Sequence, residues 1–118
     1  MTKTILIYDD DAEILFLCKA ILSKEYRVQT FSRCDTAVED AKTFQPDLIL
    51  MDLWIPQIGG QQAIKLLKAD LATDNIPVDI FSANSGLSEM FKGLNADGFL
   101  EKPFDISALK ATIAKYIN

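Results

Sequence analysis

The sequence contains 118 residues, enough for one domain with a hydrophobic core, and its 49% apolar and 25% charged residues are ordinary for a globular protein. Its net charge of −5 disfavours direct binding to nucleic acid or to anionic membranes, which usually attract a basic surface. The absence of histidine excludes a histidine metal ligand, a histidine base and a phosphohistidine on this chain. The N-terminal apolar run is too short for a signal peptide or a membrane span, so we expect a cytoplasmic protein.

The first half of the chain predicts strands and helices in alternation. Residues 4–8 form a continuous apolar run typical of a buried strand, and Asp11 is placed to cap the helix that follows. The more polar run 27–31 favours an edge strand, residues 35–44 favour a helix, and 47–51 predict a third strand. Helical spacing places these side chains inward: Ile14, Leu17, Cys18, Ile21, Ala37, Val38, Ala41 and Phe44.

The second half continues the alternation after a loop over 53–60 that contains Pro56 and a Gly-Gly pair. We expect helices over 61–70 and 87–94, strands over 78–81 and 99–100, and a last helix capped by Asp105. The inward positions expected here are Ile64, Leu67, Leu71, Ala108, Leu109, Ile113 and either Tyr116 or Ile117. Asp79 interrupts the fourth strand, where an unpaired carboxylate would be costly, so we expect it to reach the rim of the sheet or to find a donor.

Five alternations of strand and helix predict an α/β fold, a doubly wound parallel sheet with helices on both faces in three layers. The polar second strand belongs at an edge, and right-handed crossovers then favour the strand order 2-1-3-4-5. In such open sheets ligands bind outside the carboxyl ends of the strands. The residues that follow each strand are therefore the candidates for function.

Polar side chains follow four of the predicted strands: Asp9 and Asp10, Asp52, Ser82 and Lys102. Carboxylates without histidine or cysteine make a hard, all-oxygen site of the kind that prefers Mg2+, Mn2+ or Ca2+, and a few protein ligands completed by water suit Mg2+ best. A metal, an ammonium and a hydroxyl around one carboxylate can seat a phosphoryl group, with Asp52 as the attacking oxygen.

The segments 5–11, 46–56, 80–83 and 99–104 together resemble the receiver domain of two-component response regulators. The resemblance covers essentially the whole chain and implies a flavodoxin-like fold, with one receiver domain over 1–118 and no effector domain. It implies a signalling domain that catalyses only its own phosphorylation and dephosphorylation. The phosphoryl group would come from a histidine kinase or a histidine phosphotransfer protein, and an unknown downstream protein would read the result.

The resemblance also assigns roles to the residues of the candidate site. Asp52 would accept the phosphoryl group, and Lys102 would pair with it. Asp10 would bind Mg2+ directly, Asp9 mainly through water, and the backbone carbonyl of Trp54 would be a further ligand. No other cofactor is implied.

Two further residues would act as a switch. Ser82 would contact the phosphoryl group and move toward it, and Phe99 would rotate into the space that Ser82 leaves. The surface of the fourth helix, fifth strand and fifth helix would then change for a partner.

Three other functions are alternatives to this interpretation. A small hydrolase that forms an aspartyl phosphate commonly carries a second acid two residues after its nucleophile, where this chain has Trp54. A flavin or nucleotide carrier needs a small-residue loop after the first strand, where three aspartates would repel phosphate. A degenerate receiver that acts only as a protein-binding module remains an alternative, which the full set of polar residues argues against.

Overall fold

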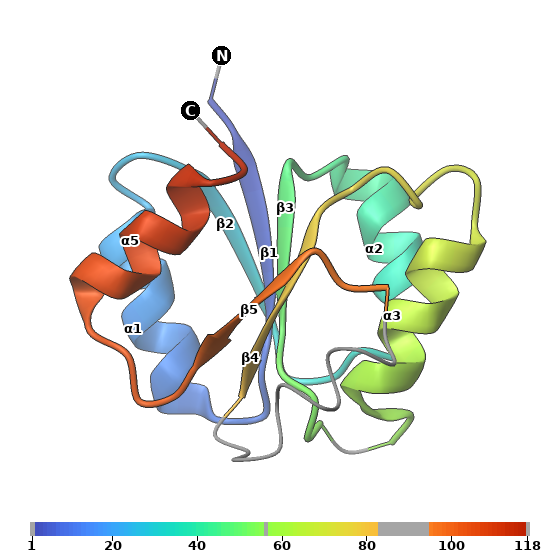
Figure 1. Ribbon diagram of the computed structural model, residues 1–118, viewed down its shortest axis with the longest axis horizontal. Helices are drawn as coiled ribbons and strands as arrows, with labels where there is room; N and C mark the ends of the chain where they lie inside the picture. The colour runs from blue at the N-terminus through green and yellow to red at the C-terminus, as the bar shows by residue number, and fades with distance from the viewer. Residues whose placement is uncertain (1, 56, 83–94, 118) are drawn as a thin grey trace.

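Five parallel strands form one sheet in the order β2-β1-β3-β4-β5, as the sequence predicted (Figure 1). The computed structural model describes residues 2–55, 57–82 and 95–117. The strands are β1 (Thr4–Tyr8), β2 (Arg27–Phe31), β3 (Leu48–Met51), β4 (Val78–Ser82) and β5 (Gly98–Glu101). Their carboxyl ends lie at one end of the sheet, away from both chain termini (Figure 1).

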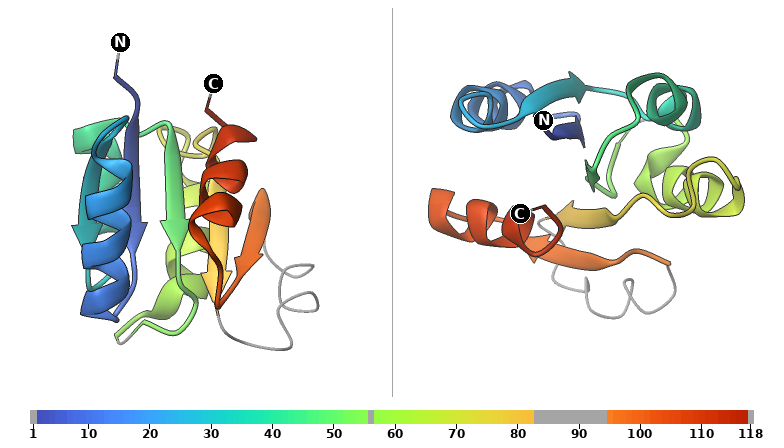
Figure 2. Two further views of the ribbon diagram at one scale, coloured as in Figure 1. Left: turned by 90° about the vertical axis from the view of Figure 1, so that its left-hand side faces the viewer. Right: turned by 90° about the horizontal axis from the view of Figure 1, so that it is seen from above.

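Within the described part of the chain, two helices cover each face of the sheet and make three layers (Figures 1 and 2). Helices α1 (Ala12–Leu22) and α5 (Ile106–Ala114) lie on one face, and α2 (Ala37–Phe44) and α3 (Gly59–Ala69) lie on the other. Each face has its own apolar core, since successive residues of β1 point alternately into the two cores. Among the described residues, no helix is long and apolar enough to cross a membrane.

The predicted caps hold α1 and α5 in place. Asp11 accepts hydrogen bonds from the backbone N–H groups of Glu13 and Ile14, and Asp105 accepts one from Ala108 at 2.7 Å. Each cap follows the end of a strand, so each helix begins at the carboxyl end of the sheet, where the polar residues lie. The prediction of helix starts at these two aspartates is confirmed.

Some predictions of inward-facing side chains are wrong. Leu71 is 90% exposed because α3 ends at Ala69, which places Leu71 in the following turn rather than on the helix face. Leu17 is 54% exposed, since the buried stripe of α1 is centred on Cys18 and Leu22. The helix expected over 87–94 lies outside the described residues.

Asp79 finds a donor but does not reach the rim of the sheet. It is 1% exposed in β4, and the hydroxyl of Tyr116 donates to its Oδ2 at 2.8 Å. One of the two expected outcomes is therefore confirmed.

Candidate functional site

Three carboxylates from two adjacent central strands meet at the carboxyl end of the sheet. Asp9 and Asp10 follow β1, Asp52 follows β3, and a ligand oxygen from each lies within 4.8 Å of the others. Asp9 is 0% exposed and Asp52 is 5% exposed, whereas Asp10 is open to solvent. The parallel pairing of Tyr8 with Met51 sets this arrangement, because it brings the two strand ends level.

Lys102, just beyond β5, supplies a positive charge to the buried carboxylates. Its Nζ lies 2.5 Å from Oδ2 of Asp9 and 3.6 Å from Oδ2 of Asp52. The ammonium also lies 5.0 Å from the ring centre of Phe81, within the range of a cation–π contact. One ammonium is thus shared between two negative charges, and the more deeply buried carboxylate holds it closer.

Backbone groups fix the remaining orientation of the carboxylates. The N–H of Asp11 donates to Oδ1 of Asp9 at 2.9 Å, and the N–H of Trp54 donates to Oδ1 of Asp52 at 3.3 Å. The N–H of Asp52 itself donates to the carbonyl of Tyr8 at 2.9 Å, which ties the end of β3 to the end of β1. In each buried carboxylate, Oδ1 therefore accepts a hydrogen bond from a backbone N–H and Oδ2 lies toward Lys102.

Burial raises the pKa of Asp52 to about 6, and the nearby negative charge of Asp9 acts in the same direction. Lys102 and the N–H of Trp54 act in the opposite direction. Asp52 is therefore mostly ionised at neutral pH, the state in which a carboxylate can act as a nucleophile. Any added cation near its oxygens would favour the ionised form.

Gly60 lets the start of α3 approach the backbone of Asp52, at a position where the sequence predicted only a loop. A Cβ at Gly60 would overlap the carbonyl oxygen of Asp52 and lie 2.8 Å from its carbonyl carbon. The neighbouring Gly59 has φ of 78° but open surroundings, since a Cβ there would lie 3.8 Å from the carbonyl oxygen of Leu53. Gly60 is therefore needed for space and Gly59 for backbone conformation.

We expect Gly60→Ala to lower the free energy of unfolding by about 2 kcal/mol or more, since its methyl group must displace backbone rather than a flexible side chain. Gly59→Asn is the matched control, because asparagine tolerates positive φ and should cost about 1 kcal/mol or less. Urea unfolding of both variants measures the difference. Equal losses would contradict the assignment of close approach to Gly60.

The remaining predicted site residues are Ser82, Trp54 and Phe99. Ser82 is the last residue of β4 and pairs in register with Glu101, but its side chain lies outside the described part of the structure. Trp54 is 53% exposed and meets Asp52 through its backbone N–H. Phe99 lies in β5, paired with Ile80, and is 40% exposed.

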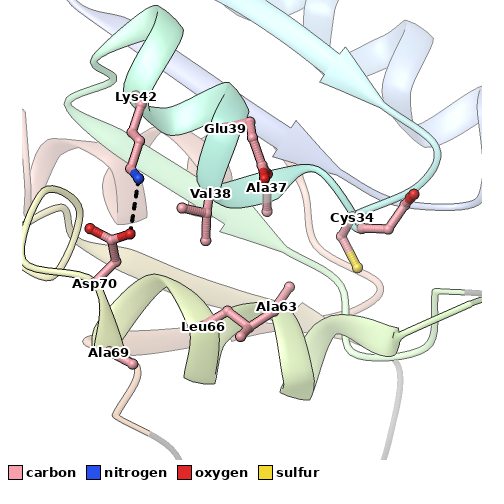
Figure 3. Close-up of a pocket in the computed structure, with 10 residues that line it drawn as sticks. Cys34, Ala37, Val38, Glu39, Lys42, Ala63, Leu66, Ala69 and Asp70 are labelled. Atoms are coloured by element: carbon pink, nitrogen blue, oxygen red, sulfur yellow. Dashed lines mark ion pairs between the residues drawn. The ribbon is translucent and has the colours of Figure 1, made fainter.

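A separate hollow of about 430 Å³ lies between α2 and α3, and the ion pair of Lys42 with Asp70, 3.0 Å long, spans these helices (Figure 3). Its lining includes Cys34, a free, buried thiol whose pKa burial raises to about 11. Such a thiol is protonated and unreactive at neutral pH. The hollow is not the candidate site, because the acidic cluster of Asp9, Asp10 and Asp52 does not line it.

The cluster suits a divalent metal. Three carboxylate oxygens, one on a solvent-exposed side chain, are hard ligands that leave room for water in the shell, which is the way Mg2+ is usually held. Buried like charges that share one ammonium also gain from a further cation. The residues present therefore fit Mg2+.

The fold and this acidic cluster define a doubly wound α/β domain with a charged site at the carboxyl end of its sheet. The family model described as "Response regulator receiver domain" matches residues 5–114, and the chain belongs to that family.

Several characterised proteins are similar over nearly the whole chain. The chain is 34% identical over 116 residues to the phosphate regulon transcriptional regulatory protein PhoB of Klebsiella pneumoniae, a match that covers 96% of this chain and 51% of PhoB. It is 34% identical to the response regulator PleD of Caulobacter vibrioides (96% of this chain, 26% of PleD). It is 30% identical to histidine kinase P4 of Formosa agariphila (98% of this chain, 9% of the kinase). The chain thus spans about half or less of these curated relatives.

Solved structures show the same architecture. The receiver domain of sensor histidine kinase PA1611 from Pseudomonas aeruginosa PAO1, a structure with a magnesium ion coordinated in its active-site cleft, superposes with a TM-score of 0.90 at 26% identity and covers 99% of this chain and 98% of that one. The chemotaxis protein CheY4 of Vibrio cholerae has a TM-score of 0.89 at 22% identity, with 99% and 100% covered. The second likeness concerns the fold alone.

Proposed function

We propose that this receiver domain accepts a phosphoryl group on Asp52 from a phosphohistidine of a kinase or phosphotransfer partner, in a reaction that depends on Mg2+. The observation that carries the proposal is the contact geometry of three carboxylates and Lys102 at one end of the sheet. Membership of the receiver family, relatives that include a histidine kinase, and the magnesium-bound receiver domain of PA1611 support it.

In this mechanism an oxygen of Asp52 forms a bond to phosphorus while the bond from phosphorus to the donor's histidine nitrogen breaks. The N–H of Trp54 holds Oδ1 of Asp52, which leaves Oδ2, on the side of Lys102, as the attacking atom. Lys102 is close enough to move from the carboxylates to the oxygens of the incoming group, whose charge it would stabilise.

Asp9, Asp10 and the backbone carbonyl of Trp54 would hold Mg2+ together with Asp52. When bound, the ion supplies charge neutralisation for the phosphoryl oxygens. Asp9 is fixed by the N–H of Asp11 and by Lys102, so it would act mainly through water, whereas the exposed Asp10 is free to turn toward the metal. The chain's own residues thus provide both the metal ligands and the nucleophile.

Phosphorylation would be read at the surface made by β5 and α5, with Ser82 and Phe99 as the switch residues. Ser82 ends the strand next to the acceptor strand, and Phe99 lies one strand further out. A hydroxyl drawn toward the phosphoryl group would therefore alter packing between β4 and β5. The domain would then lose the group by slow hydrolysis, and acts in signalling rather than on a separate substrate.

Fluorescence of Trp54 tests this function. Trp54 is the single tryptophan of the chain, and its backbone touches Asp52, so its signal reports on the site. We expect a saturable change with Mg2+, followed by a second change with beryllofluoride, a phosphoryl mimic, that is lost in Asp52→Asn. Calorimetry that detects neither metal nor mimic binding would refute the acceptor function and leave a receiver that works by protein contacts alone.

A further inference from the structure

A further buried carboxylate, Asp79, lies within the sheet and outside the cluster of Asp9, Asp10 and Asp52. Asp79 is the second residue of β4, paired in register with Leu50 of β3 and Gly98 of β5, and it is 1% exposed. This is the amino-terminal half of the strand, whereas the acidic cluster lies beyond the carboxyl ends. An ionised group at such a position is costly unless its oxygens are fully hydrogen-bonded.

The hydrogen bonding of Asp79 is incomplete. Tyr116, in the turn after α5, donates its hydroxyl to Oδ2 at 2.8 Å, while Oδ1 has no hydrogen-bond partner among the described residues. Gly98 leaves the space for this pair, because a Cβ there would overlap the hydroxyl of Tyr116 and lie 2.8 Å from Oδ2 of Asp79. The contact thus joins β4, β5 and the turn after α5. Among the described residues, it gives the buried carboxylate of Asp79 one hydrogen-bond donor.

Two other charged groups of the described residues, Lys115 and Asp97, act on Asp79 in opposite directions. Lys115, from the end of α5, lowers its pKa, and Asp97, from the segment before β5, raises it. Asp97 is itself paired with Lys68 of α3 at 3.0 Å. Burial is the largest influence, and it raises the pKa of Asp79 to about 6 despite the hydrogen bond from Tyr116.

We propose that Asp79, Tyr116 and Gly98 form a proton-controlled latch that holds the C-terminal end of α5 against the sheet when Asp79 is protonated and favours its release when Asp79 is ionised. The reason is the orphaned Oδ1. In the closed form an ionised Oδ1 is buried and has no donor among the described residues, whereas opening of the turn at 115–117 lets water reach it.

The direction of the pH dependence follows from the linkage between proton binding to Asp79 and closure of the latch. In the open form Asp79 would have an ordinary aspartate pKa, below its value in the closed form, so the closed form binds the proton more tightly. The latch is therefore fully closed at low pH and loosens as pH rises toward the pKa of about 6. Because α5 and β5 make up the surface that would signal, this device adds a response to protons that is independent of Asp52.

Hydrogen exchange of the Tyr116 and Ile117 amides measures the latch, since both donate to the carbonyl of Ile113, at 3.0 and 2.9 Å. After correction for the intrinsic exchange rate, we expect their protection to fall by up to about 100-fold between about pH 4 and pH 7, the change that a pKa difference of roughly two implies. The amide of Tyr26, in the turn after α1, donates to the carbonyl of Leu22 at 2.9 Å and serves as the internal control for global unfolding.

Asp79→Asn should make the pH profile at Tyr116 and Ile117 flat, because asparagine imitates the protonated acid and leaves Asp52 to titrate normally. Asp35→Asn is the matched control, since it removes an exposed acid paired with Arg33 and should leave the profile unchanged. A flat profile in the wild type, or an unaltered one in Asp79→Asn, would overturn the latch.

The carboxyl carbon shift of Asp79 gives a second measurement that needs no variant at this residue. It should titrate with a midpoint near the pKa of about 6 in the wild type. Tyr116→Phe should raise that midpoint, because the lost hydroxyl had favoured the ionised form. Absence of titration between about pH 4 and pH 8, or an unchanged midpoint in Tyr116→Phe, would refute the proposal.

Discussion

Asp52→Asn should lower phosphoryl incorporation by about a thousandfold or more, because the amide removes the attacking oxygen. Oδ2 of Asp52 lies 3.6 Å from Nζ of Lys102. This separation is longer than a close hydrogen bond, so the oxygen is available to bond to phosphorus. The measurement is intact-mass spectrometry after incubation with Mg2+ and a small donor such as phosphoramidate. Wild-type protein should gain one phosphoryl group.

The three consecutive aspartates provide a sharp control for this result. Asp11→Asn should incorporate the group normally, since Asp11 caps α1 through its Oδ1, a contact that asparagine can also make. Asp10→Asn should need a higher Mg2+ concentration if Asp10 binds the metal. Equal incorporation in Asp52→Asn and wild type would mean that another residue is the acceptor.

Lys102→Met should lower the free energy of unfolding by about 3 kcal/mol in metal-free buffer, the cost typical of removing one partner from a buried ion pair. Asp9 is 0% exposed and Asp52 is 5% exposed, and Lys102 contacts both. Methionine keeps the apolar length of the side chain, so the loss would report the charge rather than packing. Urea unfolding at neutral pH measures it.

Lys110→Met is the matched control, because Lys110 forms an exposed pair with Glu25 at 3.6 Å and its loss should cost about 1 kcal/mol or less. Added Mg2+ should stabilise Lys102→Met more than the wild type, since the cation would replace the lost positive charge. Equal losses in the two lysine variants would contradict a central role for Lys102 in balancing the buried carboxylates.

The fold was predictable from sequence because its signals are local and repeated. The apolar runs at 4–8 and 48–51 are buried along their whole length apart from Thr4, which is half-buried, and Asp11 and Asp105 cap the two helices that were expected to begin after them. Helix faces were less predictable. Leu71 shared the helical spacing of Ile64 and Leu67, but the helix ends before it, and spacing alone does not mark that end.

The candidate site was predictable for a different reason. In a parallel sheet the residues after each strand converge at one edge, so knowing the strand ends was enough to place Asp9, Asp10, Asp52 and Lys102 together. The unequal sharing of Lys102 between Asp9 and Asp52 could not be predicted, because it depends on side-chain burial and backbone donors. The need for glycine at position 60 also arises only when α3 is packed against the end of β3.

By itself, therefore, the sequence determined the alternation of strands and helices, the two helix caps and the set of residues that follow the strand ends, since each of these follows from local pattern and chain connectivity. Tertiary structure alone decided which donor Asp79 meets. Its donor, Tyr116, is 37 residues away, and the space for the pair depends on Gly98 in a neighbouring strand. Contacts between distant segments depend on packing, and packing has no local pattern in the chain.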